Sequence, residues 1–178
     1  MKKQNKIVLL GYMGSGKTTL GKELAAVLNH KFIDLDEYIV KKEKLSIAEL
    51  FETKGEDFFR KKEVKYLKKL LKSKKSFVLA LGGGTPQIDG AMKMINKYGL
   101  SIYLKASVQT LYNRLAPNEV ERPILTQITE DYLFDYIKTH LKKREFNYNR
   151  ADFSVEVDGI DTKEIIQQIV SKISKKEK

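Results

Sequence analysis

Short apolar stretches alternate with longer amphipathic stretches along this sequence. Each apolar stretch is only about five residues long, which is typical of a buried strand. The stretch at 77–81 is apolar throughout, so we expect this strand to be covered on both faces. The strands predicted in this way are 6–10, 31–35, 77–81, 100–104 and 153–157.

The stretches between these strands carry apolar residues at helical spacing. Leu20, Leu24 and Leu28 fall on one face of a helix, and Ser46 and Glu49 have the spacing of a capping box. Because strands and helices alternate, we predict an α/β fold, in which helices cover both faces of a parallel sheet. The predicted helices are 17–29, 46–51, 56–74, 89–98, 107–115, 130–144 and 162–173, with an irregular segment at 116–127.

Length and composition favour one domain, residues 1–178. Hydrophobic residues make up 42% of the chain and charged residues 32%, as is usual for a globular protein. The chain has no cysteine, which excludes disulfides and thiolate metal sites. No apolar run approaches the ~20 residues of a membrane span, and the apolar run near the N-terminus is too short for a signal peptide. We therefore expect a cytoplasmic protein without a membrane partner. A monomer is also expected, although none of these observations addresses the oligomeric state.

The net charge of +11 comes mostly from lysines spread over several predicted helices. Aromatic residues that could stack on bases are not interleaved with these lysines. Solvated helix faces therefore explain the charge better than nucleic-acid binding, which stays a remote alternative. Arginine is rare by comparison with lysine. Each arginine is therefore a candidate for a site that needs a planar, bidentate hydrogen-bond donor. The arginines are Arg60, Arg114, Arg122, Arg144 and Arg150.

The segment Gly11–Thr18 matches the phosphate-binding loop (P-loop) pattern completely. Its glycines let backbone N–H groups approach phosphate oxygens, and the helix that follows directs its positive end at them. In this pattern Lys17 reaches the β- and γ-phosphates and the Thr18 hydroxyl binds Mg²⁺. Nucleotide binding is therefore predicted, with Mg²⁺ as cofactor. The ATP-binding residues expected here are Gly14, Ser15, Gly16, Lys17 and Thr18 of this segment, and Thr19 directly after it.

Two acidic residues end the strand predicted at 31–35. Asp34 and Asp36 are two positions apart, so they share one face of an extended strand end. Ligands of α/β proteins collect at the carboxyl ends of the strands. One of the two carboxylates is expected to hold the metal, and the other to orient an acceptor hydroxyl.

Three further motifs point to ligand binding, two of them to a second ligand and one to the phosphates. Glu63 lies one helical turn after Arg60 and can hold its guanidinium in place. The glycines at 82–84 end a strand and allow a ligand to approach the backbone closely. Arg122 lies in the irregular segment, which could close over the phosphates. His30 and His140 are isolated and are expected to be structural or exposed.

Together these motifs resemble the shikimate kinases, in the same order and over about residues 6–157. The resemblance implies a P-loop NTPase fold of the nucleoside-monophosphate-kinase type, a five-stranded parallel sheet flanked by helices. It also implies a substrate-binding region at about 34–63 and a lid at about 114–127. The motifs that carry it are Gly11–Thr18, Asp34 with Asp36, 46–51, Arg60 with Glu63, Gly82-Gly83-Gly84, and Arg122-Pro123.

The activity implied is transfer of the γ-phosphate of ATP to the 3-hydroxyl of shikimate, a step of aromatic amino-acid biosynthesis. Another small-metabolite kinase, such as a gluconate kinase, is the alternative, and a nucleoside monophosphate kinase fits the acceptor-side motifs less well. Carried over residue by residue, the resemblance gives Asp36, Lys17 and Arg122 catalytic roles, with Asp34 and Thr18 on the metal. It assigns ATP also to Arg114 and Arg122, and shikimate to Asp36, Arg60, Gly82, Gly83, Gly84 and Arg144.

The sequence departs from the family pattern near its second carboxylate-binding arginine. The family usually has a proline between that arginine and the following tyrosine, whereas 144–148 reads Arg-Glu-Phe-Asn-Tyr. Arg144 fits the position best, and Arg150 is the competing candidate.

Overall fold

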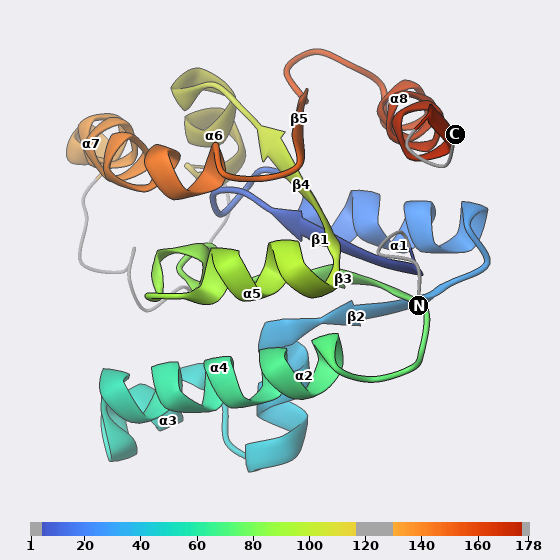
Figure 1. Cartoon of the computed structure of the whole chain (residues 1–178). Coiled ribbons are helices and arrows are strands. Elements are labelled where there is room, and N and C mark those ends of the chain that lie inside the picture. Colours follow the sequence, from blue (N-terminus) through green and yellow to red (C-terminus); the bar gives the residue numbers. More distant parts are fainter. Residues whose placement is uncertain (1–4, 117–129, 176–178) are drawn as a thin grey trace.

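A parallel sheet forms the centre of the computed structural model, which describes residues 5–116 and 130–175. Its five strands lie in the order β2-β3-β1-β4-β5, and every neighbouring pair is parallel (Figure 1). The strands are β1 (Lys6–Leu10), β2 (Lys31–Asp34), β3 (Phe77–Ala80), β4 (Leu100–Lys105) and β5 (Phe153–Glu156). All five strands expected from the sequence are thus confirmed.

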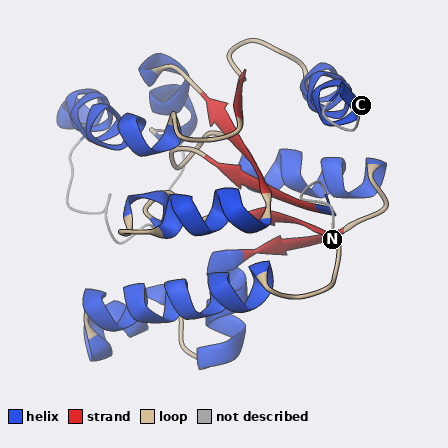
Figure 2. Ribbon diagram, viewed as in Figure 1, coloured by secondary structure: helices blue, strands red, loops and turns tan. Residues whose placement is uncertain are grey.

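Helices cover the two faces of this sheet, as Figure 2 shows. Helix α1 packs against β3 and α8 on one side, and α5 packs against β4 and α4 on the other (Figure 1). The bounds are α1 Lys17–Val27, α2 Leu35–Glu43, α3 Ile47–Lys54, α4 Glu56–Leu71, the 3₁₀ turn η2 Thr85–Gln87, α5 Ala91–Tyr98, α6 Val108–Leu115, α7 Glu130–Tyr148 and α8 Thr162–Lys175.

The strands that are apolar throughout are buried because helices cover them on both faces. Ile7, Val8 and Leu9 of the central strand β1 are fully buried, and every residue of β3 is buried too. A strand with helices on both faces has no polar side, so its sequence is apolar rather than alternating. The capping box at α3 is also confirmed, because Ser46 and Glu49 each accept a hydrogen bond from the other's backbone N–H.

Helix α2 is the element that the sequence did not reveal, and it corrects one prediction. Asp34 and Asp36 were expected to share a face of an extended strand end, which is wrong. Asp34 is the N-cap of α2: its Oδ1 accepts hydrogen bonds from the backbone N–H of Asp36, at 3.0 Å, and of Glu37, at 3.4 Å. Asp36 consequently lies in the first helical turn. Capping by a short acidic side chain is what ends the strand here.

The carboxyl ends of β1, β2 and β3 meet at one edge of the sheet. The phosphate-binding loop follows β1, Asp34 ends β2, and the triple-glycine turn follows β3. Gly11 begins the loop at φ +147°, and a Cβ there would lie 2.7 Å from the carbonyl oxygen of Leu104. No other residue fits this junction, so the turn out of β1 depends on glycine.

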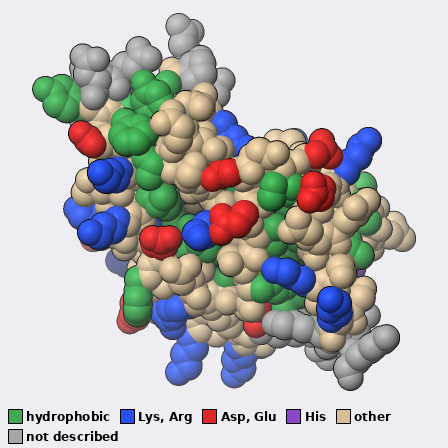
Figure 3. Space-filling view, turned by 90° about the horizontal axis from the view of Figure 1, so that it is seen from above, with side chains coloured by type: hydrophobic (Ala, Val, Ile, Leu, Met, Phe, Trp, Pro, Cys, Tyr) green, Lys and Arg blue, Asp and Glu red, His purple; other side chains and the backbone are tan. Residues whose placement is uncertain are grey.

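Charged side chains of both signs lie over the face of the molecule that Figure 3 displays. On this face lysines and arginines are interspersed with acidic side chains and form no continuous basic strip (Figure 3). In residues 5–116 and 130–175, no helix combines the length and the apolar character that a membrane span requires.

Candidate active site

The phosphate-binding loop lies between β1 and α1 and is closed by its own lysine. The Nζ of Lys17 donates hydrogen bonds to the carbonyl oxygens of Gly11, at 3.0 Å, and of Tyr12, at 2.7 Å. Ser15 is buried in the loop, and Thr19 follows in α1 with an exposed side chain. Arg114 of α6 donates to the carbonyl oxygen of Gly14 at 3.1 Å, which brings a second cation to the loop.

A hydroxyl and a carboxylate meet beside this loop. The Oγ1 of Thr18, in the first turn of α1, donates to Oδ2 of Asp34 at 3.0 Å. Both groups offer the oxygen ligands that Mg²⁺ prefers. In the part of the chain that the structure describes, no cluster of three or more His, Cys, Asp or Glu side chains forms a metal cage. The pair fits Mg²⁺ nonetheless, because this ion is usually bound by one or two carboxylates together with substrate phosphates.

Asp36 lies between the glycine turn and the acidic side chain of Glu63. A Cβ at Gly82 would lie 2.8 Å from Oδ1 of Asp36 and 3.2 Å from Oε1 of Glu63. Burial, followed by the charges of Glu63 and Asp34, raises the pKa of Asp36 to about 6. A carboxylate with this pKa binds a proton far more readily near neutral pH than an ordinary aspartate does.

Arg60 of α4 is held by two carboxylates. Its Nη1 lies 2.7 Å from Oε2 of Glu63, which is fully buried, and its Nη2 lies 3.0 Å from Oε1 of Glu56. Burial acts to lower the pKa of Arg60, but the two carboxylates outweigh it and raise the pKa, so the guanidinium stays charged. A Cβ at Gly84 would lie 3.0 Å from Nη1 of Arg60, which puts the guanidinium against the glycine turn.

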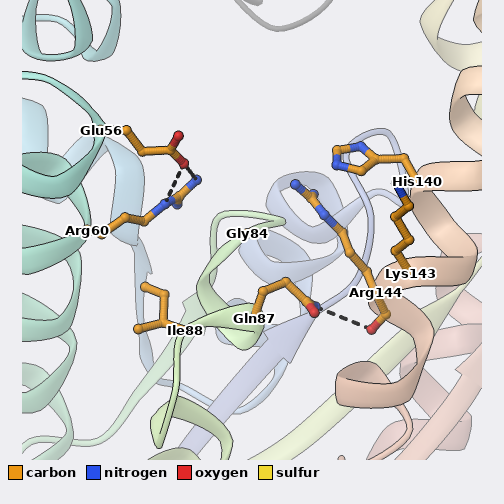
Figure 4. Close-up of a pocket in the computed structure, with 8 residues that line it drawn as sticks. All are labelled: Glu56, Arg60, Gly84, Gln87, Ile88, His140, Lys143 and Arg144. Carbon is orange, nitrogen blue, oxygen red and sulfur yellow. Dashed lines mark hydrogen bonds and ion pairs between the residues drawn. The ribbon is translucent and has the colours of Figure 1, made fainter.

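Arg144 of α7 approaches the same turn from the opposite side. A Cβ at Gly83 would lie 3.3 Å from Nη1 of Arg144. Two hydrogen bonds hold helix α7 against this turn. The hydroxyl of Tyr148 donates to the carbonyl oxygen of Gly83 at 2.7 Å. Nε2 of Gln87 donates to the carbonyl oxygen of Arg144 at 3.3 Å. Two guanidinium groups, from helices far apart in the sequence, therefore face each other across two glycines (Figure 4).

The competing candidate Arg150 does not reach this place. It donates to Oδ1 of Asn147 at 3.2 Å, and its carbonyl oxygen accepts a hydrogen bond from Asn96. Arg150 is not among the residues that line the cavity between the two guanidinium groups. Of the two arginines, the geometry therefore brings Arg144 to the site.

A cavity of about 480 Å³ opens between Arg60 and Arg144, a volume suited to a small metabolite. Figure 4 shows both arginines directed toward this cavity from opposite walls. His140, expected to be structural or exposed, is half-buried and lines the cavity. It lies one helical turn before Arg144, and this spacing was the signal that could have identified it. The lining residues are Glu56, Arg60, Gly84, Gln87, Ile88, His140, Lys143 and Arg144.

The remaining predicted residues fall partly outside the described chain. Arg122, and with it most of the segment at 114–127 expected to form a lid, lies within residues 117–129, which the structure does not describe. Arg114 is described and contacts the phosphate-binding loop, as noted above.

Comparisons with known proteins identify the family to which this chain is similar. The shikimate kinase family model matches residues 13–174. A shikimate kinase from Flavobacterium johnsoniae is 42% identical over 166 residues, covering 93% of this chain and 96% of the relative.

Two solved structures share the fold. The crystal structure of shikimate kinase from Bacteroides thetaiotaomicron has a TM-score of 0.89 at 34% identity, over 95% of this chain and 98% of that one. The Acinetobacter baumannii enzyme in complex with shikimate has a TM-score of 0.88 at 30% identity, over 97% of this chain and 94% of that one. From the family match, the relatives and the fold together, the chain belongs to the shikimate kinase family.

Proposed function

We propose that this protein transfers the γ-phosphate of ATP to the 3-hydroxyl of shikimate, giving ADP and shikimate 3-phosphate. The observation that carries the proposal is the pair of guanidinium groups, Arg60 and Arg144, facing a cavity beside a phosphate-binding loop. The structural similarity to an enzyme in complex with shikimate supports the choice of acid over other small metabolites.

Arg60 and Arg144 bind the carboxylate of shikimate in this proposal. A guanidinium presents parallel N–H donors that match the two oxygens of a carboxylate. Arg60 is already oriented by Glu63 and Glu56, so little rotamer freedom remains to be lost when the acid binds. The Gly82–Gly84 backbone leaves the space between the arginines open to the substrate ring.

Asp36 accepts the proton of the attacking hydroxyl. The charges of both Lys17 and Arg60 act to lower its pKa, so both cations lie near this carboxylate. Asp36 is therefore close both to the phosphate-binding loop and to the arginine proposed to bind the substrate carboxylate. Its raised pKa suits a group that must be ionised before the reaction and must take up a proton during it.

The phosphates of ATP bind to the amides of the loop and to Lys17 and Arg114. Thr18 and Asp34 would hold Mg²⁺, which would offset negative charge on the transferring phosphoryl group. These cations supply positioning and electrostatic stabilisation, the main requirements of phosphoryl transfer. The substrate-binding region is assigned to about 34–63, and the segment at 114–127 with Arg122 is assigned to a lid that closes over the phosphates.

Several properties expected from the sequence stay predictions. These are the organisation of residues 1–178 as one domain, a monomeric state, a cytoplasmic location, and the absence of nucleic-acid binding.

ADP formation is the direct test of the proposed reaction. We expect ADP to be released from ATP and Mg²⁺ only when shikimate is present, because water is a poor acceptor in a closed site. The measurement is ADP formed with shikimate, with gluconate, and with no acceptor. Faster ADP release with gluconate than with shikimate would contradict the proposal.

Replacing Asp36 tests the proton acceptor. Asp36→Asn should retain ATP binding but lose most turnover, about 10²–10⁴-fold, because an amide cannot take the proton. Steady-state kinetics and nucleotide titration measure the two effects. Asp135→Asn, at an exposed position of α7, is the matched control and should resemble the wild type. Near-normal turnover of Asp36→Asn would remove the residue from its role.

The pH dependence of kcat/KM for shikimate should report the same carboxylate. Since the pKa of Asp36 is raised to about 6, its ionised form predominates above that pH and is lost as the pH falls through it. We therefore expect kcat/KM to fall on the acid side with a midpoint near 6, rather than near the ordinary aspartate value. The same midpoint in the residual activity of Asp36→Asn would assign it to another group.

Arg60→Lys tests carboxylate recognition. The ammonium is a point charge and cannot form the two parallel hydrogen bonds of a guanidinium. The KM for shikimate should rise at least about tenfold, the effect of losing one charge-assisted hydrogen bond, while the KM for ATP changes little. Initial rates with each substrate varied in turn separate the two constants. An equal rise in both would argue against the assignment.

A further inference from the structure

Tyr12 and His140 form a hydrogen-bonded pair at the wall of the cavity. The proposed reaction gives this pair no role. Tyr12 belongs to the phosphate-binding loop and is 1% exposed. Its hydroxyl lies 3.1 Å from Nδ1 of His140, and the two rings meet edge to face with centroids 5.8 Å apart. The ring of Tyr136 contacts the imidazole too, at 4.9 Å between centroids. The imidazole is therefore fixed by two tyrosines.

The same tyrosine contacts Arg144. The guanidinium carbon of Arg144 lies 5.7 Å from the centroid of the Tyr12 ring, within the range of a cation–π interaction. His140 precedes Arg144 by one turn of α7, and both side chains line the cavity from the same helix (Figure 4). Tyr12 thus contacts two successive turns of α7. Its ring packs against the guanidinium of Arg144, and its hydroxyl is hydrogen-bonded to His140.

Tyr12 and His140 are both uncharged, which suits their position beside the Arg144 guanidinium. Burial, followed by the charges of Arg144 and Lys143, lowers the pKa of His140 to about 4, so the imidazole is neutral at ordinary pH. Burial raises the pKa of Tyr12, so its hydroxyl keeps its proton. The hydrogen bond between them therefore joins two neutral groups, and it adds no positive charge that would repel the guanidinium.

We propose that Tyr12 and His140 are positioning residues that hold the guanidinium of Arg144 in place for the carboxylate of the acid substrate. Arg60 has two carboxylates to orient it. Among the described residues Arg144 has none, and besides Tyr148 it contacts the aromatic ring of Tyr12, which is itself fixed through a hydrogen bond. An arginine that is already in place loses less conformational freedom on binding. The inference rests on the proposed function, because it specifies how that acid is recognised.

Tyr12→Phe is the sharpest test, because it removes the hydroxyl and keeps the ring under Arg144. We expect kcat/KM for shikimate to fall about three- to tenfold, the range that loss of one hydrogen bond gives, through a higher KM at unchanged kcat. The KM for ATP should not change. Tyr66→Phe is the matched control, since it also removes a hydrogen-bonded tyrosine hydroxyl, on Glu43 and outside the cavity.

A substrate without a carboxylate separates positioning from a general effect on folding. The methyl ester of shikimate cannot pair with Arg144, so Tyr12→Phe should lower the ratio of kcat/KM for shikimate to that for the ester. His140→Leu should lower this ratio as well, and His140→Asn should restore part of it, because the amide can take the place of Nδ1. In an Arg144→Met background, Tyr12→Phe should have no further effect on kcat/KM for shikimate.

Three outcomes would overturn the inference. They are an unchanged ratio in Tyr12→Phe and His140→Leu, an equal loss for acid and ester, and an undiminished effect of Tyr12→Phe without Arg144. If one variant fails to fold, the other tests the same hydrogen bond from its opposite end. A wild-type protein that forms no ADP with shikimate would refute the proposed function itself, whereas an active wild type with unchanged ratios refutes the positioning role alone.

Discussion

The ion pair between Arg60 and the buried carboxylate of Glu63 is the interaction on which the acid side of the site depends. Glu63 is fully buried, and a buried charge left without its partner typically costs about 3–5 kcal/mol. Arg60 supplies that partner at 2.7 Å, and the hydroxyl of Thr85 also donates to the carboxylate. The carboxylate is thus satisfied from α4 on one side and from the turn after β3 on the other.

This one carboxylate affects each neighbouring functional group. It orients the guanidinium of Arg60 toward the cavity, and its negative charge adds to the rise of the Asp36 pKa. Through Thr85 it also fixes the start of η2, directly after the glycine turn. In the proposed function, substrate recognition and proton transfer are therefore linked electrostatically, because the group that orients the arginine also makes the nearby aspartate a stronger base.

Much of the fold and part of the site could be predicted from the sequence, because their signals are local. The apolar strands, the helical periodicities and the phosphate-binding loop each occupy a short continuous stretch, and Arg60 with Glu63 follows from helical spacing. Helix α2 was missed because its start depends on Asp34 acting as an N-cap, and the acidic pair also fits an extended strand end.

The contact of His140 with Tyr12 could not be predicted for a different reason, although the spacing of His140 to Arg144 could have placed it at the cavity. Its partner Tyr12 lies more than a hundred positions earlier, and only the packing of α7 against the phosphate-binding loop brings them together. Sequence spacing favoured Arg144 over Arg150, but the missing proline kept both candidates open. The tertiary structure separates them, because Arg144 lies within α7 and lines the cavity, whereas Arg150 lies two positions beyond the end of that helix.

The triple-glycine turn has a consequence for how this enzyme can vary. Its three successive positions face three different side chains: Gly82 faces Asp36, Gly83 faces Arg144 and Gly84 faces Arg60. A methyl group added at any of these glycines would contact one of the three site side chains. Substitutions should therefore be tolerated least at Gly82, Gly83 and Gly84, the residues without a side chain. In the proposed function, the turn would contribute by the volume that it leaves empty for the substrate.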